Sequence, residues 1–310
     1  MSYSRRNFIR TTTSGTTALL LASVDKLAAQ PVAGKHHTDF RLKVLATDWG
    51  YKGGIDNFCA QVKKEGYEGI EIWWPMEKAK QEALFAALRK YDLEVGLLVS
   101  GDQSAFQDHL NHFKTMIGEA ANNPYQRPIY INCHSGRDFF LFDDNQVFID
   151  HTKELAAKTG ILILHETHRS RMLFAAPATR RFIEKNPGLR LTFDVSHWTN
   201  VHNSLLDDQS ENVNIALDRV DHIHARVGHP DGPQVGDPRA PEWQECMNAH
   251  LAWWDRVVEL KKQRGETLTI LTEFGPPDYM PTLPYTHLPV ADQWAINVYM
   301  MHFLRKRYLS

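Results

Sequence analysis

Apolar and polar positions alternate along this chain in a pattern that predicts short buried strands separated by amphipathic helices. Strand-like runs are expected at residues 42–46, 69–72, 93–99, 128–133, 161–165, 189–193, 222–225 and 267–272. Continuous apolar runs without a helical period, such as 161–165, are typical of strands buried on both faces of a parallel sheet. Helical patterns follow these strands, at residues 55–66, 77–91, 104–121, 145–158, 179–185, 210–217, 242–263 and 289–307.

This regular alternation predicts the α/β class and a single (β/α)8 TIM barrel over residues 31–310, because strands and helices in equal number close a barrel of roughly 250 residues. A doubly wound open sheet is the main alternative. It is disfavoured because no Gly-x-Gly-x-x-Gly turn follows the first strand. Helix ends are predicted from N-caps at Ser104, Thr179 and Ser210, and from C-terminal glycines at Gly66, Gly160 and Gly265.

The first 30 residues carry a different pattern from the rest of the chain. Residues 4–10 read Ser-Arg-Arg-Asn-Phe-Ile-Arg, and a weakly apolar stretch over 16–24 is followed by Ala28 and Ala29. This order resembles a cleavable twin-arginine signal peptide, which implies export to the periplasm. The apolar stretch is too short for a helix across a hydrocarbon core of about 30 Å. A basic tail without a targeting role is the alternative.

Composition excludes several classes of protein. The chain has 310 residues, of which 43% are hydrophobic and 23% charged, and its formal net charge is −2. These values are ordinary for a globular protein and give no reason to expect a nucleic-acid partner or a membrane span. Cys59, Cys133 and Cys246 lie too far apart for a zinc motif. Self-association into a homo-oligomer is left open.

Polar side chains gather at the ends of the last four predicted strands. They are Glu166, Asp194, His197, His222, His224, Arg226 and Glu273. Barrel enzymes keep their chemistry at the C-terminal ends of the strands, so these residues are expected to share one rim. Two glutamates, an aspartate and one histidine would suit Mn²⁺, Mg²⁺ or Co²⁺, and Zn²⁺ is also compatible. Any one of them alone is as easily explained by a structural role.

The pattern resembles the xylose isomerase-like TIM barrel superfamily, and within it the sugar phosphate isomerase/epimerase-type proteins. The resemblance lies in residues 66–71, Gly-Tyr-Glu-Gly-Ile-Glu, and in the Asp194-x-x-His197 and His222-x-His224 spacings. It implies one divalent metal ion held by Glu166, Asp194, His224 and Glu273. It also implies that Glu166 and Glu273 move the substrate proton, and that His197 contacts substrate oxygens.

The chemistry of proton transfer beside a carbonyl agrees with the expected metal site, and further residues are available to bind the substrate. A divalent ion bound to a carbonyl stabilises the enediolate formed when a carboxylate removes the neighbouring proton. Further substrate contacts are predicted from Arg226, His134, His168, Trp49 and Trp74, with core packing as the alternative for the tryptophans. The Pro- and Gly-rich segment 227–242 and the segment 275–284 are expected to cover the substrate.

These observations favour a metal-dependent sugar isomerase or epimerase acting on a free or oxidised sugar, a small molecule. One alternative is a lyase or hydratase that uses the same metal site on keto-glycosides. A phosphodiesterase of the abasic-site endonuclease type is disfavoured, because the second and third strands end in Ile-Trp-Trp and Leu-Val-Ser and lack the extra metal ligands. A sugar-binding protein without catalytic activity is the remaining alternative.

Overall fold

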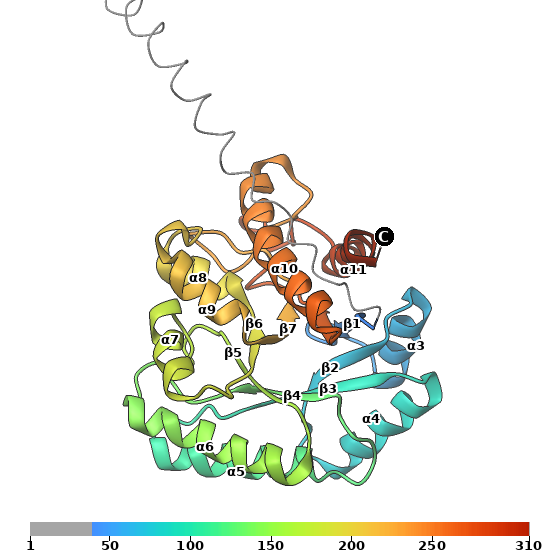
Figure 1. Cartoon of the computed structure of the whole chain (residues 1–310). Helices are drawn as coiled ribbons and strands as arrows, with labels where there is room; N and C mark the ends of the chain where they lie inside the picture. Colours follow the sequence, from blue (N-terminus) through green and yellow to red (C-terminus); the bar gives the residue numbers. More distant parts are fainter. Residues whose placement is uncertain (1–38, 310) are drawn as a thin grey trace, which may run out of the picture. The chain divides into compact units, whose positions relative to one another are not determined.

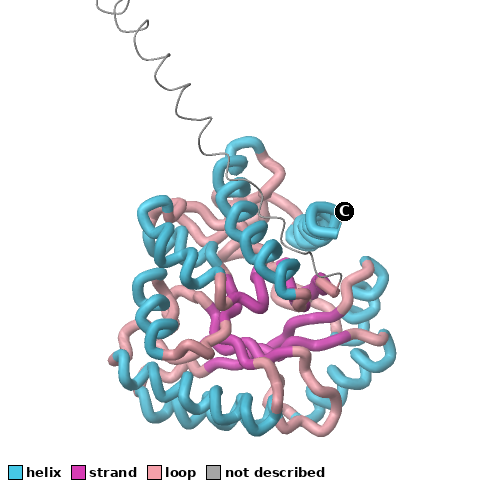
Figure 2. The backbone as a smooth tube through the Cα atoms, viewed as in Figure 1, coloured by secondary structure: helices cyan, strands magenta, loops and turns pink. Residues whose placement is uncertain are grey.

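A computed structural model describes residues 39–309, whose strands form a closed parallel barrel surrounded by helices (Figures 1 and 2). The strands are β1 (Arg41–Thr47), β2 (Gly69–Trp73), β3 (Glu94–Ser100), β4 (Tyr130–His134), β5 (Ile163–Glu166), β6 (Leu191–Phe193), β7 (Val220–His224) and β8 (Thr267–Thr272). Each strand pairs with the next, and β1 closes the barrel on β8 with Leu45 opposite Leu271. The predicted (β/α)8 barrel is therefore confirmed.

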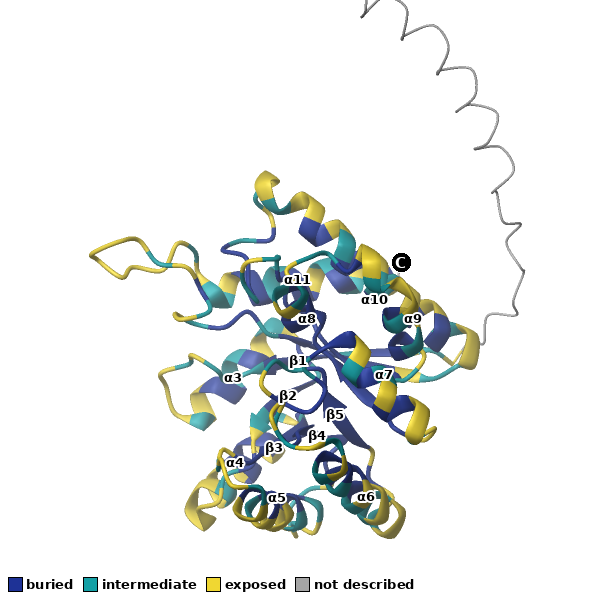
Figure 3. Cartoon of the chain, turned by 90° about the vertical axis from the view of Figure 1, so that its left-hand side faces the viewer, coloured by how far each residue is buried: buried dark blue, intermediate teal, exposed yellow. Residues whose placement is uncertain are grey.

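Helices follow the strands and cover the outside of the barrel. They are α3 (Ile55–Glu65), α4 (Lys78–Tyr91), α5 (Phe106–Ala121), α6 (Phe142–Thr159), α7 (Ala176–Lys185), α8 (Val195–His202), α9 (Ser210–Leu217), α10 (Gln244–Arg264) and α11 (Gln293–Leu309). Two short 3-10 turns, η1 (Asp207–Gln209) and η2 (Pro241–Trp243), precede α9 and α10. Figure 3 shows the outer faces of these helices exposed and the strands behind them buried.

The helix ends agree with the sequence in part. Gly66, Gly160 and Gly265 each follow a helix with a left-handed backbone, at φ of 90°, 66° and 65°, as predicted. The predicted N-caps are wrong, because α5, α7 and α9 are capped by Ala105, Ala175 and Gln209. Helix α7 begins earlier than expected because a proline lies in its first turn, where its missing N–H is not needed.

Helix α8 was not predicted by the hydrophobic pattern. Its first five residues, 195–199, are all buried, so the segment has no polar face that would reveal a helical period. Asp194 caps this helix by accepting a hydrogen bond from the Ser196 N–H at 3.0 Å. The cap fixes the carboxylate of Asp194 at the rim of the barrel.

The barrel interior is only partly apolar. Leu45, Tyr130, Leu164 and Leu271 form a small cluster that is separate from the larger core between sheet and helices. Strand residues alternate between the two faces of a sheet, so every second side chain points inward. Several inward positions near the strand ends hold buried polar groups, namely Glu71, Asn132, His222 and His224. These groups form the inner part of a polar site at the C-terminal rim of the barrel.

Two sequence expectations concern the ends and the environment of the chain. Residues 1–30, the predicted signal peptide, lie outside the described residues. Within residues 39–309 there is no helix long and apolar enough to cross a bilayer.

Candidate active site

The four predicted metal ligands meet at one rim of the barrel. Glu166 ends β5, Asp194 follows β6, His224 ends β7 and Glu273 follows β8. The Nδ1 atom of His224 lies 3.0 Å from Oε2 of Glu273 and 3.6 Å from Oε2 of Glu166. Asp194, His224 and Glu273 each offer one ligand atom, and these atoms lie within 4.8 Å of one another. The structure thus gathers the whole predicted set.

The donor atoms of this set fit a divalent cation. Among the described residues, neither Nδ1 of His224 nor Oε2 of Glu273 has a hydrogen-bond partner, although both atoms are buried. These two atoms face each other at 3.0 Å, and Oε2 of Glu273 also lies 3.4 Å from Nη1 of Arg226. Buried polar atoms that make no hydrogen bond are uncommon, and a bound cation would satisfy both of them. Burial alone would lower the pKa of His224, but Glu273 and Glu166 raise it well above its usual value. The pocket therefore favours positive charge at this point.

Arg226 enters the same cluster, in line with its predicted place at the shared rim, and forms ion pairs that spacing alone did not reveal. Its guanidinium pairs with Asp194 through Nη2 and with Oε2 of Glu273 through Nη1 at 3.4 Å. Nη2 also donates to Nε2 of His197 at 2.9 Å. This side chain is 2% exposed, so its charge acts at close range on both carboxylates. Arg226 and His197, both predicted substrate contacts, form one unit with the predicted ligand Asp194.

Glu71 belongs to the site, although the sequence reasoning used it only as part of a motif. Its Oε1 lies 3.1 Å from Nε2 of His224, and its Oε2 lies 3.3 Å from Nε2 of His222. Burial would raise the pKa of Glu71, but His224 and His222 hold it well below its ordinary value. An ionised Glu71 accepts the Nε2 hydrogen of His224 and leaves Nδ1 free to bind a metal.

His222 lies deeper in the barrel than His224. Its Nε2 also contacts the Tyr130 hydroxyl at 3.1 Å, and its Nδ1 lies 2.7 Å from Oγ1 of Thr269. Its ring is therefore satisfied within the interior, and it meets the metal-ligand cluster through Glu71 and through the ring of His224, whose centre lies 5.0 Å away. A signal for Glu71 existed in the sequence, because a charged residue between Ile70 and Ile72 of a predicted strand occupies an inward position.

Strand β4 supplies two groups that hold Glu166. Nδ2 of Asn132 donates to Oε2 of Glu166 at 2.7 Å, and Nε2 of His134 lies 2.8 Å from the same oxygen. Burial would raise the pKa of Glu166, but the nearby His134 and His224 lower it well below its usual value. Glu166 is thus an ionised carboxylate with a fixed orientation. His134, a predicted substrate contact, contacts Glu166 directly.

A row of imidazole rings crosses the rim from β4 to α8. The rings of His134 and His168 are 4.5 Å apart, and those of His168 and His197 are 3.9 Å apart. Burial lowers the pKa of His168, and His134 adds to this effect; burial together with His168 and Arg226 lowers the pKa of His197. Both rings are therefore neutral and able to accept or donate hydrogen bonds to a polar ligand.

Aromatic side chains form the walls of the cavity above this cluster, which we call the catalytic pocket. It has a volume of about 280 Å³ and is lined by Asp48, Trp49, Glu71, Trp73, His134, His168, Arg226, Glu273 and Tyr279, among others. Trp49 and Tyr279 meet edge to face at 4.8 Å, and the Arg226 guanidinium lies 4.8 Å from the Tyr279 ring centre. Trp49, which the sequence predicts to contact substrate, thus lines the catalytic pocket.

Trp74 is not brought to the catalytic pocket. It is buried, packs against Phe85, and donates its indole N–H to Glu119 at 3.2 Å. Its neighbour Trp73 is 43% exposed and borders the pocket instead, with its ring 5.2 Å from that of His134. The alternation of side chains at the end of β2 separates these two adjacent tryptophans.

The two rim segments, 227–242 and 275–284, differ in whether they line the catalytic pocket. No residue of 227–242 lines the catalytic pocket, so the prediction that this segment covers the substrate finds no counterpart in the pocket wall. Gln234 instead binds the backbone of Gly275, accepting from its N–H at 2.7 Å and donating to its carbonyl at 3.2 Å. The segment after β8 does contribute to the wall through Tyr279.

Comparison with known proteins agrees with the barrel. The D-tagatose 3-epimerase-like protein has a similar structure, with 14% identity, a TM-score of 0.55, and coverage of 86% of this chain and 97% of that chain. A xylose isomerase domain protein from Alicyclobacillus acidocaldarius subsp. acidocaldarius is 13% identical, with a TM-score of 0.54 and coverage of 86% of this chain and 97% of that chain. The probable 3-DHS dehydratase AsbF from Bacillus anthracis is 14% identical, with a TM-score of 0.53 and coverage of 85% of this chain and 98% of that chain.

At this level of identity the solved structures support the fold alone. No curated protein sequence matches the chain. The family model described as xylose isomerase-like TIM barrel matches residues 59–256, which is more than half of the chain and includes β2 to β7. This protein therefore belongs to the xylose isomerase-like TIM barrel family.

Proposed function

We propose that this protein is a metal-dependent sugar isomerase or epimerase that abstracts a proton next to a carbonyl through an enediolate. The observation that carries the proposal is the convergence of two glutamates on one imidazole, since Oε2 of Glu273 and Oε2 of Glu166 lie 3.0 Å and 3.6 Å from Nδ1 of His224. A metal held by these groups and Asp194 would polarise the carbonyl and stabilise the negative charge of the enediolate.

The two glutamates are suited to handle the substrate proton. They come from β5 and from the residue after β8, so β6 and β7 lie between them around the barrel. This placement supports approach to one carbon from two sides. One carboxylate would remove the proton and the other would return one, which inverts the centre. If a single glutamate returns the proton to the adjacent carbon, the reaction is an isomerisation.

Neighbouring side chains support these roles. Asn132 and His134 bind Oε2 of Glu166 and fix the direction from which it approaches the substrate. Arg226 and His197 face the opposite side of the cluster, where they would hold substrate hydroxyl or carbonyl oxygens. Trp49 and Tyr279 form part of the wall of the catalytic pocket over this region, and a bound substrate that displaced water there would strengthen the electrostatic interactions within.

A lyase or hydratase acting on keto-glycosides is the second candidate. It is supported by the contact of His134 with Glu166 at 2.8 Å and by the adjacent ring of His168 at 4.5 Å. Once a base has removed the proton, expulsion of a group from the next carbon needs an acid to protonate it. His134 is placed for that task, and the neutral ring of His168 beside it would position the leaving group. A new unsaturated or hydrated sugar product would identify this reaction.

The test is solvent-deuterium incorporation into a panel of sugars and keto-sugars, with wild type, Glu166→Gln and Glu273→Gln. Glutamine keeps the size and one oxygen ligand but removes the base, so each change is expected to slow exchange by about 10²- to 10⁴-fold. In an epimerase, each variant keeps faster exchange of one epimer than of the other. In a lyase, only one of the two variants loses exchange.

Two controls make the result decisive. Metal content is equalised before rates are compared, so that a lost ligand is not mistaken for a lost base. Glu82→Gln removes a carboxylate that is 58% exposed on α4 and should leave exchange unchanged. Near wild-type exchange in either Glu166→Gln or Glu273→Gln would rule out the two-carboxylate mechanism.

A further inference from the structure

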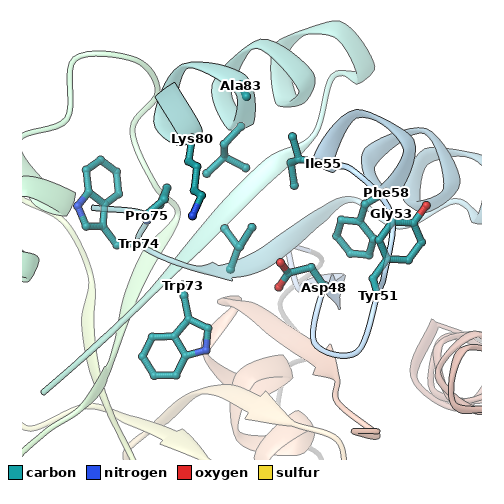
Figure 4. A pocket seen from close by; sticks show the side chains of 12 residues that line it. Asp48, Tyr51, Gly53, Ile55, Phe58, Trp73, Trp74, Pro75, Lys80 and Ala83 are labelled. Carbon is teal, nitrogen blue, oxygen red and sulfur yellow. The ribbon is translucent and has the colours of Figure 1, made fainter. Parts of the chain in front are cut away.

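A second cavity opens beside the catalytic pocket, between the segment after β1 and helices α3 and α4 (Figure 4). We call it the outer pocket. Its lining includes Asp48, Tyr51, Phe58, Trp73, Pro75, Lys80 and Ala83, and its volume is about 450 Å³. That is larger than the catalytic pocket, at about 280 Å³. None of the proposed metal ligands or proton-transfer residues lines it, so the reaction itself leaves the outer pocket unexplained.

The two cavities adjoin each other. Asp48, Ile72 and Trp73 line both of them, so these residues form a shared border. On the inner side of that border, the ring of Trp73 meets His134 at 5.2 Å, and His134 binds Glu166 at 2.8 Å. The outer pocket therefore lies directly across this border from a molecule whose reacting carbon is near Glu166.

The lining of the outer pocket combines aromatic surface with polar groups. Trp73 is 43% exposed, and Tyr51 and Phe58 add further aromatic wall. Asp48 and Lys80 enter from opposite sides, the carboxylate from the segment after β1 and the ammonium from α4 (Figure 4). Sugar rings are recognised by such sites, through apolar faces on aromatic rings and hydroxyls on charged groups.

Asp48 indicates that a polar ligand is expected here. Its carboxylate forms no ion pair and no side-chain hydrogen bond with another residue in the range 39–309. Burial raises its pKa to about 6, against a hydrogen bond from its own backbone that lowers it. Because no other described side chain donates to this carboxylate, hydroxyl donors from a ligand would add hydrogen bonds to it and offset the cost of its burial. Lys80, by contrast, pairs with Glu77 at 2.7 Å at the surface.

We propose that the substrate carries a second sugar unit, glycosidically linked to the unit that reacts, and that this second unit binds in the outer pocket. The proposal rests on the proposed isomerase or epimerase function and narrows its substrate class from monosaccharides to disaccharides. The reacting unit lies in the catalytic pocket by Glu166 and Glu273. The second unit passes Trp73, stacks on the aromatic wall, and donates hydroxyl hydrogens to Asp48.

The test compares D-fructose with lactulose, turanose and isomaltulose, which carry a second hexose on three different hydroxyls of fructose. Solvent-deuterium incorporation into each sugar is measured with the full-length enzyme loaded with Mn²⁺. At least one disaccharide is expected to be exchanged with a kcat/KM about tenfold or more above that of fructose, because a filled pocket adds binding free energy of this order. Equal or lower values for all three disaccharides would overturn the proposal.

A matched pair of variants locates the effect. Ala83 lines the outer pocket from α4, whereas the exposed Ala86 lies on the same helix and lines neither cavity. Ala83→Trp fills the outer pocket and is expected to lower the disaccharide-to-fructose ratio of kcat/KM by about tenfold or more. Ala86→Trp should leave the ratio unchanged. An unchanged ratio in Ala83→Trp would place the second sugar elsewhere and overturn the proposal.

A binding measurement separates failure of this inference from failure of the proposed function. Calorimetric titration of lactulose into Glu166→Gln, with and without Ala83→Trp, measures occupation of the outer pocket without turnover. Exchange into fructose alone, with no disaccharide bound, would leave the isomerase or epimerase standing and refute the second-sugar site. Absence of exchange into every sugar would refute the proposed function, and the inference that rests on it fails with it.

Discussion

At the scale of single residues, Glu71 determines which nitrogen of His224 is available to a metal. Its carboxylate lies 3.1 Å from Nε2 of His224 and leaves Nδ1 facing Glu273 and Glu166. A carboxylate behind a ligating histidine fixes the ring and makes it a stronger donor. Glu71 is therefore a positioning residue, since it acts on the site through His224.

We predict that Glu71→Gln weakens metal binding. The amide still accepts a hydrogen bond but carries no charge, so the His224 ring becomes a poorer ligand, and affinity should fall by about 10- to 100-fold. The measurement is competition for Mn²⁺ against a chelator, with circular dichroism to verify the fold. Glu82→Gln on the surface of α4 is the matched control. Wild-type affinity in Glu71→Gln would show that Glu71 only balances charge within the barrel.

At the scale of elements, α10 fixes the start of the segment that follows β7. His250 of α10 donates from Nδ1 to the carbonyl of Cys246 at 2.8 Å, and its Nε2 accepts the N–H of Gly228 at 3.1 Å. Both nitrogens are used by the neutral ring, which is completely buried. Protonation would break the bond to Gly228, since Nε2 could no longer accept.

This contact predicts a pH dependence of stability. Burial lowers the pKa of His250 from 6.5 to about 4 in the folded chain, so the unfolded chain takes up the proton first as the pH falls. The contribution of His250 is complete above pH 6.5 and is lost between pH 6.5 and pH 4, about 3 kcal/mol of unfolding free energy in total.

The measurement is urea unfolding from pH 4 to pH 8, compared between wild type and His250→Gln. Glutamine can accept from Gly228 without titrating, so the variant should have a flatter profile over this window. Other buried histidines titrate as well, and only the difference between the two profiles reports on His250. Parallel profiles would mean that His250 is not the titrating group.

At the scale of the whole molecule, the barrel followed from the sequence because strand and helix periods repeat regularly. The position of the site at the C-terminal rim could also be predicted from the sequence. Strand ends of a barrel share one rim, and each predicted strand end in the second half of the chain carries one of Glu166, Asp194, His224 and Glu273. Contacts across the barrel could not be predicted. The pairing of Arg226 with Asp194 and Glu273, and that of Glu71 with His224, depend on side-chain conformation in a closed interior.

Elements without a periodic signal were also missed. Helix α8 is buried on all sides over residues 195–199, so no amphipathic pattern marks it. Which of Trp73 and Trp74 borders the catalytic pocket depends on where β2 ends, and element boundaries are the least determined part of a pattern. The outer pocket arises between α3, α4 and the segment after β1, so only the assembled fold reveals it.

Closure of the barrel bears on how the chain would leave the cell. Strand β1 pairs with β8 along its length, from Arg41 opposite Thr267 to Ala46 opposite Thr272. The barrel is complete only after its last strand has been made, and the proposed metal ligands come together only then. The motif Ser-Arg-Arg-Asn-Phe-Ile-Arg at residues 4–10 predicts a route that carries folded proteins, and export by this route remains a prediction.

We predict that replacing Arg5 and Arg6 together with lysine prevents export. The double change keeps the charge of the N-terminal region but removes the guanidinium pair of the motif, so the precursor should stay in the cytoplasm with its first 30 residues attached. Cell fractionation in the natural host and N-terminal sequencing measure this, with Arg89→Lys on the surface of α4 as the control. If the wild-type chain is found in the cytoplasm with its N-terminus intact, the export prediction is wrong. The retained precursor should still bind metal, because the double change leaves every proposed metal ligand in place.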